Sequence, residues 1–141
     1  MGLSRLVRRQ RESGIRIWDT LDYWVARASG IEFKTAREAA LALDGQMAPC
    51  IFKTAQGTLR IAREDVISAW RPSSDWTIGG DIIGRERIGI IPAGIDWKAY
   101  ATGDMDATSY GVDPLIAAMR AFVVSKFGKE VPDENIFIQG L

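Results

Sequence analysis

The sequence contains no histidine, and this absence excludes several common kinds of active site. Serine and cysteine hydrolases usually rely on an imidazole base, and many zinc sites rely on imidazole ligands. A pH switch near neutrality also normally depends on histidine. Any acid–base chemistry in this chain would therefore depend on its carboxylates.

Cysteine is almost as scarce, because Cys50 is the only one. A single cysteine forms no internal disulfide, which favours a reducing, cytoplasmic location. Cys50 lies in the apolar run Pro49–Phe52. In such a run we expect a buried small hydrophobic residue and not a nucleophile.

Net charge is also absent, since 18 Lys and Arg balance 18 Asp and Glu. No overall field directs the chain toward nucleic acid or an anionic membrane, and we expect neither partner. The apolar runs are far shorter than the roughly 20 residues of a transmembrane helix, and no secretory signal is recognisable. Residues 1–14 carry a local excess of arginine, which we interpret as a poorly ordered arm in preference to a phosphate-binding one.

Length and composition predict one globular domain over residues 15–141. The chain has 141 residues, of which 47% are hydrophobic and 26% are charged. A domain of this size buries roughly 70% of its unfolded surface and needs no disulfide or metal. We find no internal repeat and no linker.

Three segments have the periodicity and end signals of helices. Asp19 is a predicted N-cap for an apolar stripe that ends at Gly30. Thr35–Glu38 is a capping box, and the helix that follows is predicted to end at Asp44–Gly45. Asp113 and Pro114 begin the third helix, which is predicted to end at Gly128.

The middle of the chain is rich in strand patterns. The segments Ala48–Thr54 and Thr58–Ala62 read as a hairpin. We expect further strands at Ile88–Ile91 and Asp96–Ala101 and an edge strand at Ile136–Ile138. A short helix is expected over Asp81–Ile88 and a loop over Thr102–Tyr110. The segment Val66–Trp70 reads as either a strand or a short helix. An exposed edge at Ile136–Ile138 would let two copies of the chain pair. The fold class is therefore α+β: a single layered domain in which a small mixed or antiparallel sheet packs against the N- and C-terminal helices.

The segment Arg71–Asp81 is the first candidate for a site. It combines turn formers, glycines, one carboxylate and one indole without a clear period, so we interpret it as a shaped loop of the kind that carries binding residues. The candidate ligand-binding residues are Ser73, Ser74, Asp75, Trp76, Gly80, Arg85, Trp97 and Arg120.

Each of the main candidates also has a structural interpretation, and we favour it. Asp75 is expected to cap the turn through backbone N–H groups. Trp76 and Trp97 are expected to be buried, although together they could form an aromatic platform. Arg120 is expected to pair with Asp75 in preference to clamping a ligand.

No set of residues indicates catalysis, a metal or a cofactor, and we assign none. Asp104 and Asp106 have ligand chemistry suited to Mg²⁺ or Ca²⁺, but two loop carboxylates alone are more typical of a solvated turn. Gly79–Gly80 lacks the spacing and the lysine of a phosphate-binding loop.

Three blocks of the sequence resemble the bacteriophage NinX family, a group of small phage and prophage proteins of unassigned function. The blocks are Leu21–Gly30; Pro72–Trp76 with Gly79–Gly80, Ile82–Ile83 and Arg85–Glu86; and Pro114–Arg120 with Ser125–Gly128. The resemblance implies a layered fold similar to the phage α-β-α sandwich proteins, a prophage origin and the cytoplasm of a bacterial host. The chain departs from the family pattern at Tyr23–Trp24, Asp81 and Gly84.

Two functions from different classes remain open at this stage. The first is a non-enzymatic binding module that captures an unknown host protein or small ligand near the segment Pro72–Asp81. The alternative is a carboxylate- or metal-dependent enzyme of nucleotide metabolism, which the loop acids would serve.

Overall fold

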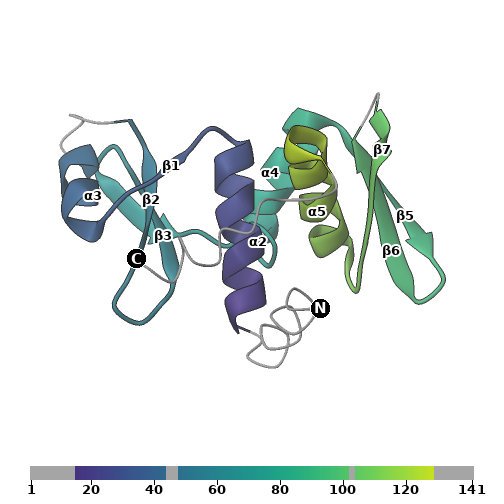
Figure 1. Ribbon diagram of the computed structural model, residues 1–141, viewed down its shortest axis with the longest axis horizontal. Coiled ribbons are helices and arrows are strands. Elements are labelled where there is room, and N and C mark those ends of the chain that lie inside the picture. The colour runs from purple at the N-terminus through teal and green to yellow at the C-terminus, as the bar shows by residue number, and fades with distance from the viewer. Residues whose placement is uncertain (1–14, 44–47, 102–103, 129–141) are drawn as a thin grey trace.

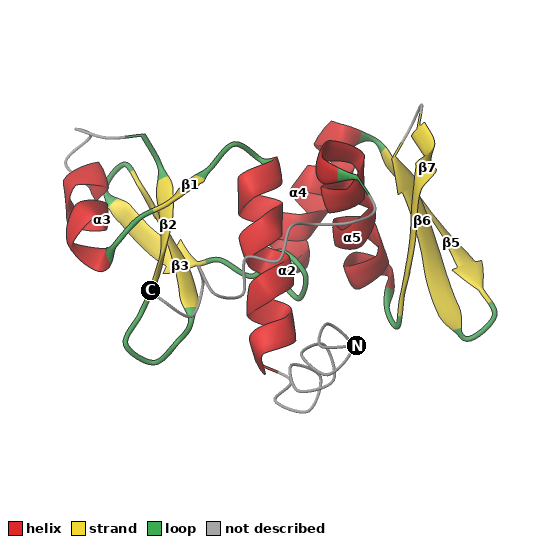
Figure 2. Ribbon diagram, in the orientation of Figure 1, coloured by secondary structure: helices red, strands yellow, loops and turns green. Residues whose placement is uncertain are grey.

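The computed structural model describes residues 15–43, 48–101 and 104–128, and these ranges contain four helices and seven strands. A four-stranded sheet, sheet A, forms one end of the molecule, and a three-stranded sheet, sheet B, forms the other (Figure 1). The helices α2, α4 and α5 lie between the two sheets, whereas α3 covers the outer side of sheet A (Figure 2). The α+β class with helices packed on sheets is confirmed, and the strands are divided between two sheets.

Sheet A contains β1 (Glu32–Phe33), β2 (Cys50–Lys53), β3 (Leu59–Arg63) and β4 (Val66–Ala69), in that order. Strand β1 is parallel to β2, and the other pairs are antiparallel. The hairpin predicted around residues 55–57 is therefore confirmed. The undecided segment that begins at Val66 is a strand, because it pairs with β3.

The two faces of sheet A contact different helices. Cys50, Phe52 and Ala62 face α3 (Ala36–Leu43), where they pack with Ala39 and Ala42. Cys50 is buried as predicted, and burial raises the pKa of its thiol. Because side chains alternate along a strand, Ile51 and Ile61 point to the opposite face and join the central core.

The predicted capping box at the start of α3 is confirmed. Thr35 Oγ1 accepts a hydrogen bond from the backbone N of Glu38 at 3.1 Å, and Glu38 Oε1 accepts one from the backbone N of Thr35 at 3.1 Å. The backbone N–H and the hydroxyl of Thr35 together hold the pKa of Glu38 below its ordinary value of 4.5.

This reciprocal cap predicts a pH-dependent contribution to stability. Since the pKa of Glu38 is lower in the folded chain than in the unfolded one, its stabilisation is fully present above about pH 4.5 and is lost as the pH falls through the folded-state pKa. We expect Glu38→Gln to lower the urea midpoint at pH 7 and to match the wild type near pH 3. In a Thr35→Ala background, the effect of Glu38→Gln on the urea midpoint should no longer depend on pH. If it still does, Thr35 is not the group that lowers the pKa of Glu38.

Sheet B is an antiparallel sheet of β5 (Ile88–Ala93), β6 (Asp96–Ala101) and β7 (Asp104–Gly111). The strands predicted before Pro92 and at Asp96–Ala101 are confirmed. The loop predicted over Thr102–Tyr110 is wrong, because β7 occupies most of that range. Its Thr, Ser and Asp residues hide the strand in the sequence, whereas pairing with β6 and packing against α5 stabilise it.

The central layer consists of α2 (Ile15–Ala28), α4 (Trp76–Glu86) and α5 (Pro114–Phe127). Helix α2 begins at Ile15, so Asp19 is an internal residue and not the predicted N-cap. The helix ends as expected near Gly30, whose φ of +80° suits glycine.

Helix α5 follows its sequence signals closely. Asp113 is the N-cap, and its Oδ1 accepts a hydrogen bond from the backbone N of Ile116 at 2.8 Å. Pro114 occupies the first turn, and Gly128 is the C-cap. The predicted start and end of this helix are therefore confirmed.

Helix α4 is longer than predicted and overturns the interpretation of Arg71–Asp81 as a loop. Residues 76–86 are helical, so only the first five residues of that segment precede the helix. The helix ends at Arg87, whose left-handed φ of +56° breaks the period before β5. The helix predicted over Asp81–Ile88 therefore begins earlier in the structure than in the prediction. The sequence suggested a turn at the paired glycines Gly79 and Gly80, whereas tertiary packing keeps both residues in the helix.

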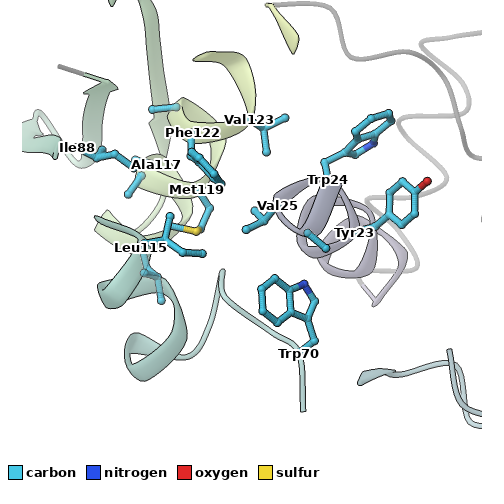
Figure 3. Packing of buried hydrophobic residues seen from close by; sticks show 14 of the residues in the cluster. Tyr23, Trp24, Val25, Trp70, Ile88, Leu115, Ala117, Met119, Phe122 and Val123 are labelled. Carbon is cyan, nitrogen blue, oxygen red and sulfur yellow. The ribbon is translucent and has the colours of Figure 1, made fainter. Parts of the chain in front are cut away.

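The core lies around α5, which is buried on nearly all sides. Met119 of α5 points toward Val25 of α2, with Trp70 beside them (Figure 3). Trp24 packs edge-on against Phe127, with ring centroids 5.2 Å apart. One contiguous cluster thus includes residues of both sheets and of α2, α4 and α5.

Some predictions fall outside the described residues. They are the arm over residues 1–14, the end of the second helix at Asp44–Gly45 and the edge strand at Ile136–Ile138. Within the described ranges, none of the helices combines the length and apolar character needed to cross a bilayer.

Candidate functional site

The segment before α4 is fastened to α2 by two hydrogen bonds that converge on Asp22. The backbone N of Ser73 donates to Asp22 Oδ1 at 2.9 Å, and Trp70 Nε1 donates to the backbone O of Asp22 at 2.8 Å. Asp22 and Ser73 are only 4% and 1% exposed. Ser73 therefore belongs to a structural junction and not to an open binding surface.

Gly79 extends this junction to α5. A Cβ atom at this position would lie 2.3 Å from the backbone O of Pro72 and 2.5 Å from Leu115 Cδ1. Only glycine lets α4 approach both groups so closely. The three sequence blocks that resemble NinX proteins therefore meet here, since Asp22, Pro72 and Leu115 each belong to a different block.

The residues at the start of α4 have different surroundings. Asp75 is the N-cap, and its Oδ1 accepts a hydrogen bond from the backbone N of Thr77 at 2.9 Å, so the predicted capping role is confirmed. The prediction that Trp76 is buried is wrong, because 55% of its surface is exposed. Gly80 lies one turn further along, where an added Cβ atom would lie 3.8 Å from Trp76 Cε3, and Ser74 is exposed.

Trp97 and Arg120 lie on the other side of the helical layer. Trp97 is in β6 and packs partly buried against the core, in line with its structural interpretation. Arg120 Nη1 donates to the backbone O of Tyr110 in β7 at 2.8 Å. The expected ion pair of Arg120 with Asp75 is absent from the described structure, because each side chain has another partner, and the predicted site residues do not converge on one pocket.

A cleft of about 720 Å³ lies instead between sheet A and α4. One wall is the face of β3 and β4 that points away from α3, and the other is one face of α4. The loop after α2 and the residues before β2 close its ends. The lining residues are Ser29, Gly30 and Ile31; Ala48 and Pro49; Ile61, Arg63, Glu64, Val66, Ser68, Ala69 and Trp70; and Thr77, Ile78, Asp81, Ile82 and Arg85.

The cleft combines an apolar interior with charges of both signs. Arg85 contacts Asp81 at 3.9 Å through Nη1 and Glu86 at 3.1 Å through Nε. In the described part of the chain, the guanidinium of Arg63 on the opposite wall forms no ion pair. The hydroxyl of Ser29, also in the lining, is buried and makes no hydrogen bond with a described residue. Such a buried unpaired polar atom carries a free-energy cost that a ligand or a water molecule can relieve.

Among the predicted site residues, Arg85 is the one that lines this cleft. Sequence reasoning missed the sheet wall because Val66–Trp70 was not assigned to a strand. Once β3 and β4 are paired, Ile61 lies opposite Ser68 and Arg63 opposite Val66, on one face. The alternation of inward and outward residues along these two segments was the signal in the sequence. Only the pairing of β3 with β4 shows that the face toward the cleft remains partly open.

The carboxylates that an enzyme would need are dispersed over the fold. Asp75 caps α4, Asp81 lines the cleft, and Asp96 begins β6. Asp104 and Asp106 belong to β7 and not to a loop. Among the residues that the structure describes, no group of three or more acidic or cysteine side chains has the arrangement of a metal site.

Comparison with protein families identifies a relationship for this chain. The family model described as "Bacteriophage P22, NinX" matches residues 18–126 of this chain. No curated protein matches the chain. The matched range includes the buried junction and both walls of the cleft.

Proposed function

Because this chain belongs to the NinX family of bacteriophage proteins, we propose that this phage accessory protein is a non-enzymatic binding module whose ligand site is the cleft between sheet A and α4. The observation that carries the proposal is the preformed cleft itself. Its volume of about 720 Å³ is in the range usual for ligand pockets, and its lining mixes apolar side chains such as Ile61 and Ile78 with charged and hydroxyl groups that can orient a ligand. We expect it to act in the host cytoplasm, in keeping with the single buried thiol.

The cleft is a better candidate than the segment Pro72–Asp81 that the sequence suggested. Ser73 is occupied by the junction with Asp22, and the Asp75 carboxylate is occupied by capping α4. By contrast, Val66 at the cleft is 60% exposed, although it is a strand residue with an apolar side chain. Exposed apolar surface in a concave site is the kind that ligand binding covers.

Filling the cleft tests this function. We expect Ser68→Trp to abolish ligand binding, because an indole would occupy the space between β4 and α4. The matched control is Ile95→Trp in the turn between β5 and β6, where the native side chain is 97% exposed. Both variants and the wild type are compared in a thermal-shift panel of metabolites and in pull-downs from host lysate.

We expect at least one ligand or partner that binds both the wild type and Ile95→Trp. Its affinity for Ser68→Trp should be lower by tenfold or more. Circular dichroism establishes that all three proteins are folded. Retention of every ligand by folded Ser68→Trp would overturn the assignment of the cleft. Empty panels for the wild type would remove the binding function itself.

A further inference from the structure

We infer that the occupant of the cleft is an extended peptide segment that pairs with the outer edge of β4, which no described strand covers, and directs a carboxylate side chain toward Arg63. This inference rests on the proposed binding function and names the class of partner. It requires three features: a sheet edge with unpaired backbone groups, a space beside that edge for the side chains of the peptide, and a charged group that favours particular residues in the peptide.

The unpaired edge follows from the pairing of β4 with β3. The backbone N of Trp70 donates to the backbone O of Leu59 at 3.1 Å. In an antiparallel ladder the backbone groups of alternate residues point toward the partner strand, so those of Ser68 also face β3. The N–H and C=O groups of Ile67 and Ala69 then point outward, and the described structure gives them no hydrogen-bond partner.

The other sheet edges are less suited to pairing. Strand β5 contains Pro92, which lacks an N–H and commonly protects an edge. On β7 the guanidinium of Arg120 already binds the backbone O of Tyr110, and β1 has only two residues. Strand β4 contains neither a proline nor a charged side chain. Among the described edges, β4 is therefore the one most open to an added strand.

The cleft lies where the side chains of an added strand would point. Val66 and Ser68 face the cleft, and the next strand would continue this surface toward α4. Every second side chain of the peptide would enter the space opposite Ile78. Main-chain bonds supply affinity in this mode of recognition, and the alternate side chains supply specificity.

Although Glu64 and Asp81 also line the cleft, the guanidinium of Arg63 favours an acidic residue at the nearest position of the peptide. Arg63 points to the same face as Val66, its cross-strand neighbour, and forms no ion pair with any described residue. A guanidinium binds a carboxylate with two parallel hydrogen bonds, which gives both energy and orientation. We therefore expect apolar residues at the other inward positions and one Asp or Glu near Arg63.

Selection from a displayed library of random dodecapeptides, with the full chain as bait, tests this inference. We expect enrichment of alternating apolar residues with one acidic position. In synthetic versions of a selected peptide, N-methylation at one alternate set of residues should lower the affinity at least tenfold, whereas methylation of the other set should leave it within twofold. Arg63→Glu should weaken binding at least tenfold, and Ile95→Lys should not.

A proline on β4 gives a second test that uses the protein side of the pairing. Ile67→Pro removes an outward N–H and should lower peptide affinity at least tenfold in a folded protein. Ser68→Pro is the comparison, because it removes an N–H that faces β3 and should instead lower the unfolding midpoint. If Ile67→Pro unfolds the chain, the N-methylated peptides decide the question with the wild-type protein.

The outcomes separate the peptide from other occupants of the cleft. Failure to enrich any peptide, or equal tolerance of N-methylation at both alternate sets, would overturn the inference. After either of these results, the cleft would still be a binding site if Ser68→Trp blocks the binding of a metabolite, but its ligand would not be a peptide. If the wild type forms concentration-dependent dimers and Ile67→Pro abolishes them, the occupant is a second copy of the chain. That result would also overturn the inference of a peptide partner.

Discussion

Gly79→Ala is expected to lower the free energy of unfolding by about 3 kcal/mol, the upper part of the usual range for overpacking. The added methyl group would lie 2.3 Å from the backbone O of Pro72 and 2.5 Å from Leu115 Cδ1. The leucine side chain can rotate, but the carbonyl is part of the buried segment that Asp22 holds. Helix α4 must therefore move away from that segment, and its packing against α5 loosens.

The same helix provides a matched control for this substitution. Gly84 also lies inside α4, and apart from the adjoining backbone of the helix no described atom lies within 4 Å of the position its Cβ would take. Gly84→Ala should stabilise the protein by up to about 1 kcal/mol, because alanine has the higher helix propensity. Guanidinium unfolding followed by tryptophan fluorescence measures both variants. Equal effects at the two positions would show that helix propensity, and not the close approach, determines the role of Gly79.

Asp22→Ala is expected to cost about 2–3 kcal/mol, because it leaves the buried backbone N–H of Ser73 without an acceptor. Asp22→Asn retains an oxygen at that position and should cost about half as much. Ser74→Ala, at the exposed neighbouring residue, should change stability by less than about 0.5 kcal/mol.

Hydrogen exchange locates the effect of Asp22 more directly than global unfolding does. The amide of Ser73 is expected to exchange at least tenfold faster in Asp22→Ala than in the wild type, relative to amides in sheet B. Unchanged protection of Ser73, together with a large loss of global stability, would show that Asp22 stabilises α2 by another contact. A selective change at Ser73 would establish the carboxylate as the link between α2 and the entry to α4.

These two substitutions probe the junction where the three NinX-like blocks meet, and they do not touch the proposed ligand contacts. Asp22, Pro72 and Leu115 hold the central helices together, whereas Arg63, Val66 and Ser68 line the cleft. Loss of ligand binding without loss of stability should therefore follow from changes on the sheet wall. The opposite pattern is expected at the junction.

The sequence by itself determined those features whose physical cause is local. Asp113 and Pro114 specify the start of α5 because a carboxylate cap and a fixed φ act within one turn. The Thr35–Glu38 capping box and the hairpin around residues 55–57 are likewise formed by neighbours in the chain. The absence of histidine and the single cysteine limited the chemistry before any fold was known.

Only the tertiary structure decided the features that depend on contacts between distant segments. Gly79 and Gly80 read as a turn, yet packing on Pro72 and Leu115 makes Gly79 part of a helix. Strand β7 exists because it pairs with β6, and β4 is a strand because it pairs with β3. The cleft lies between α4 and sheet A, which are brought together by the fold and not by neighbouring residues in the sequence. Propensity is a weak preference that such long-range contacts override, so the cleft is not apparent from the sequence without the fold.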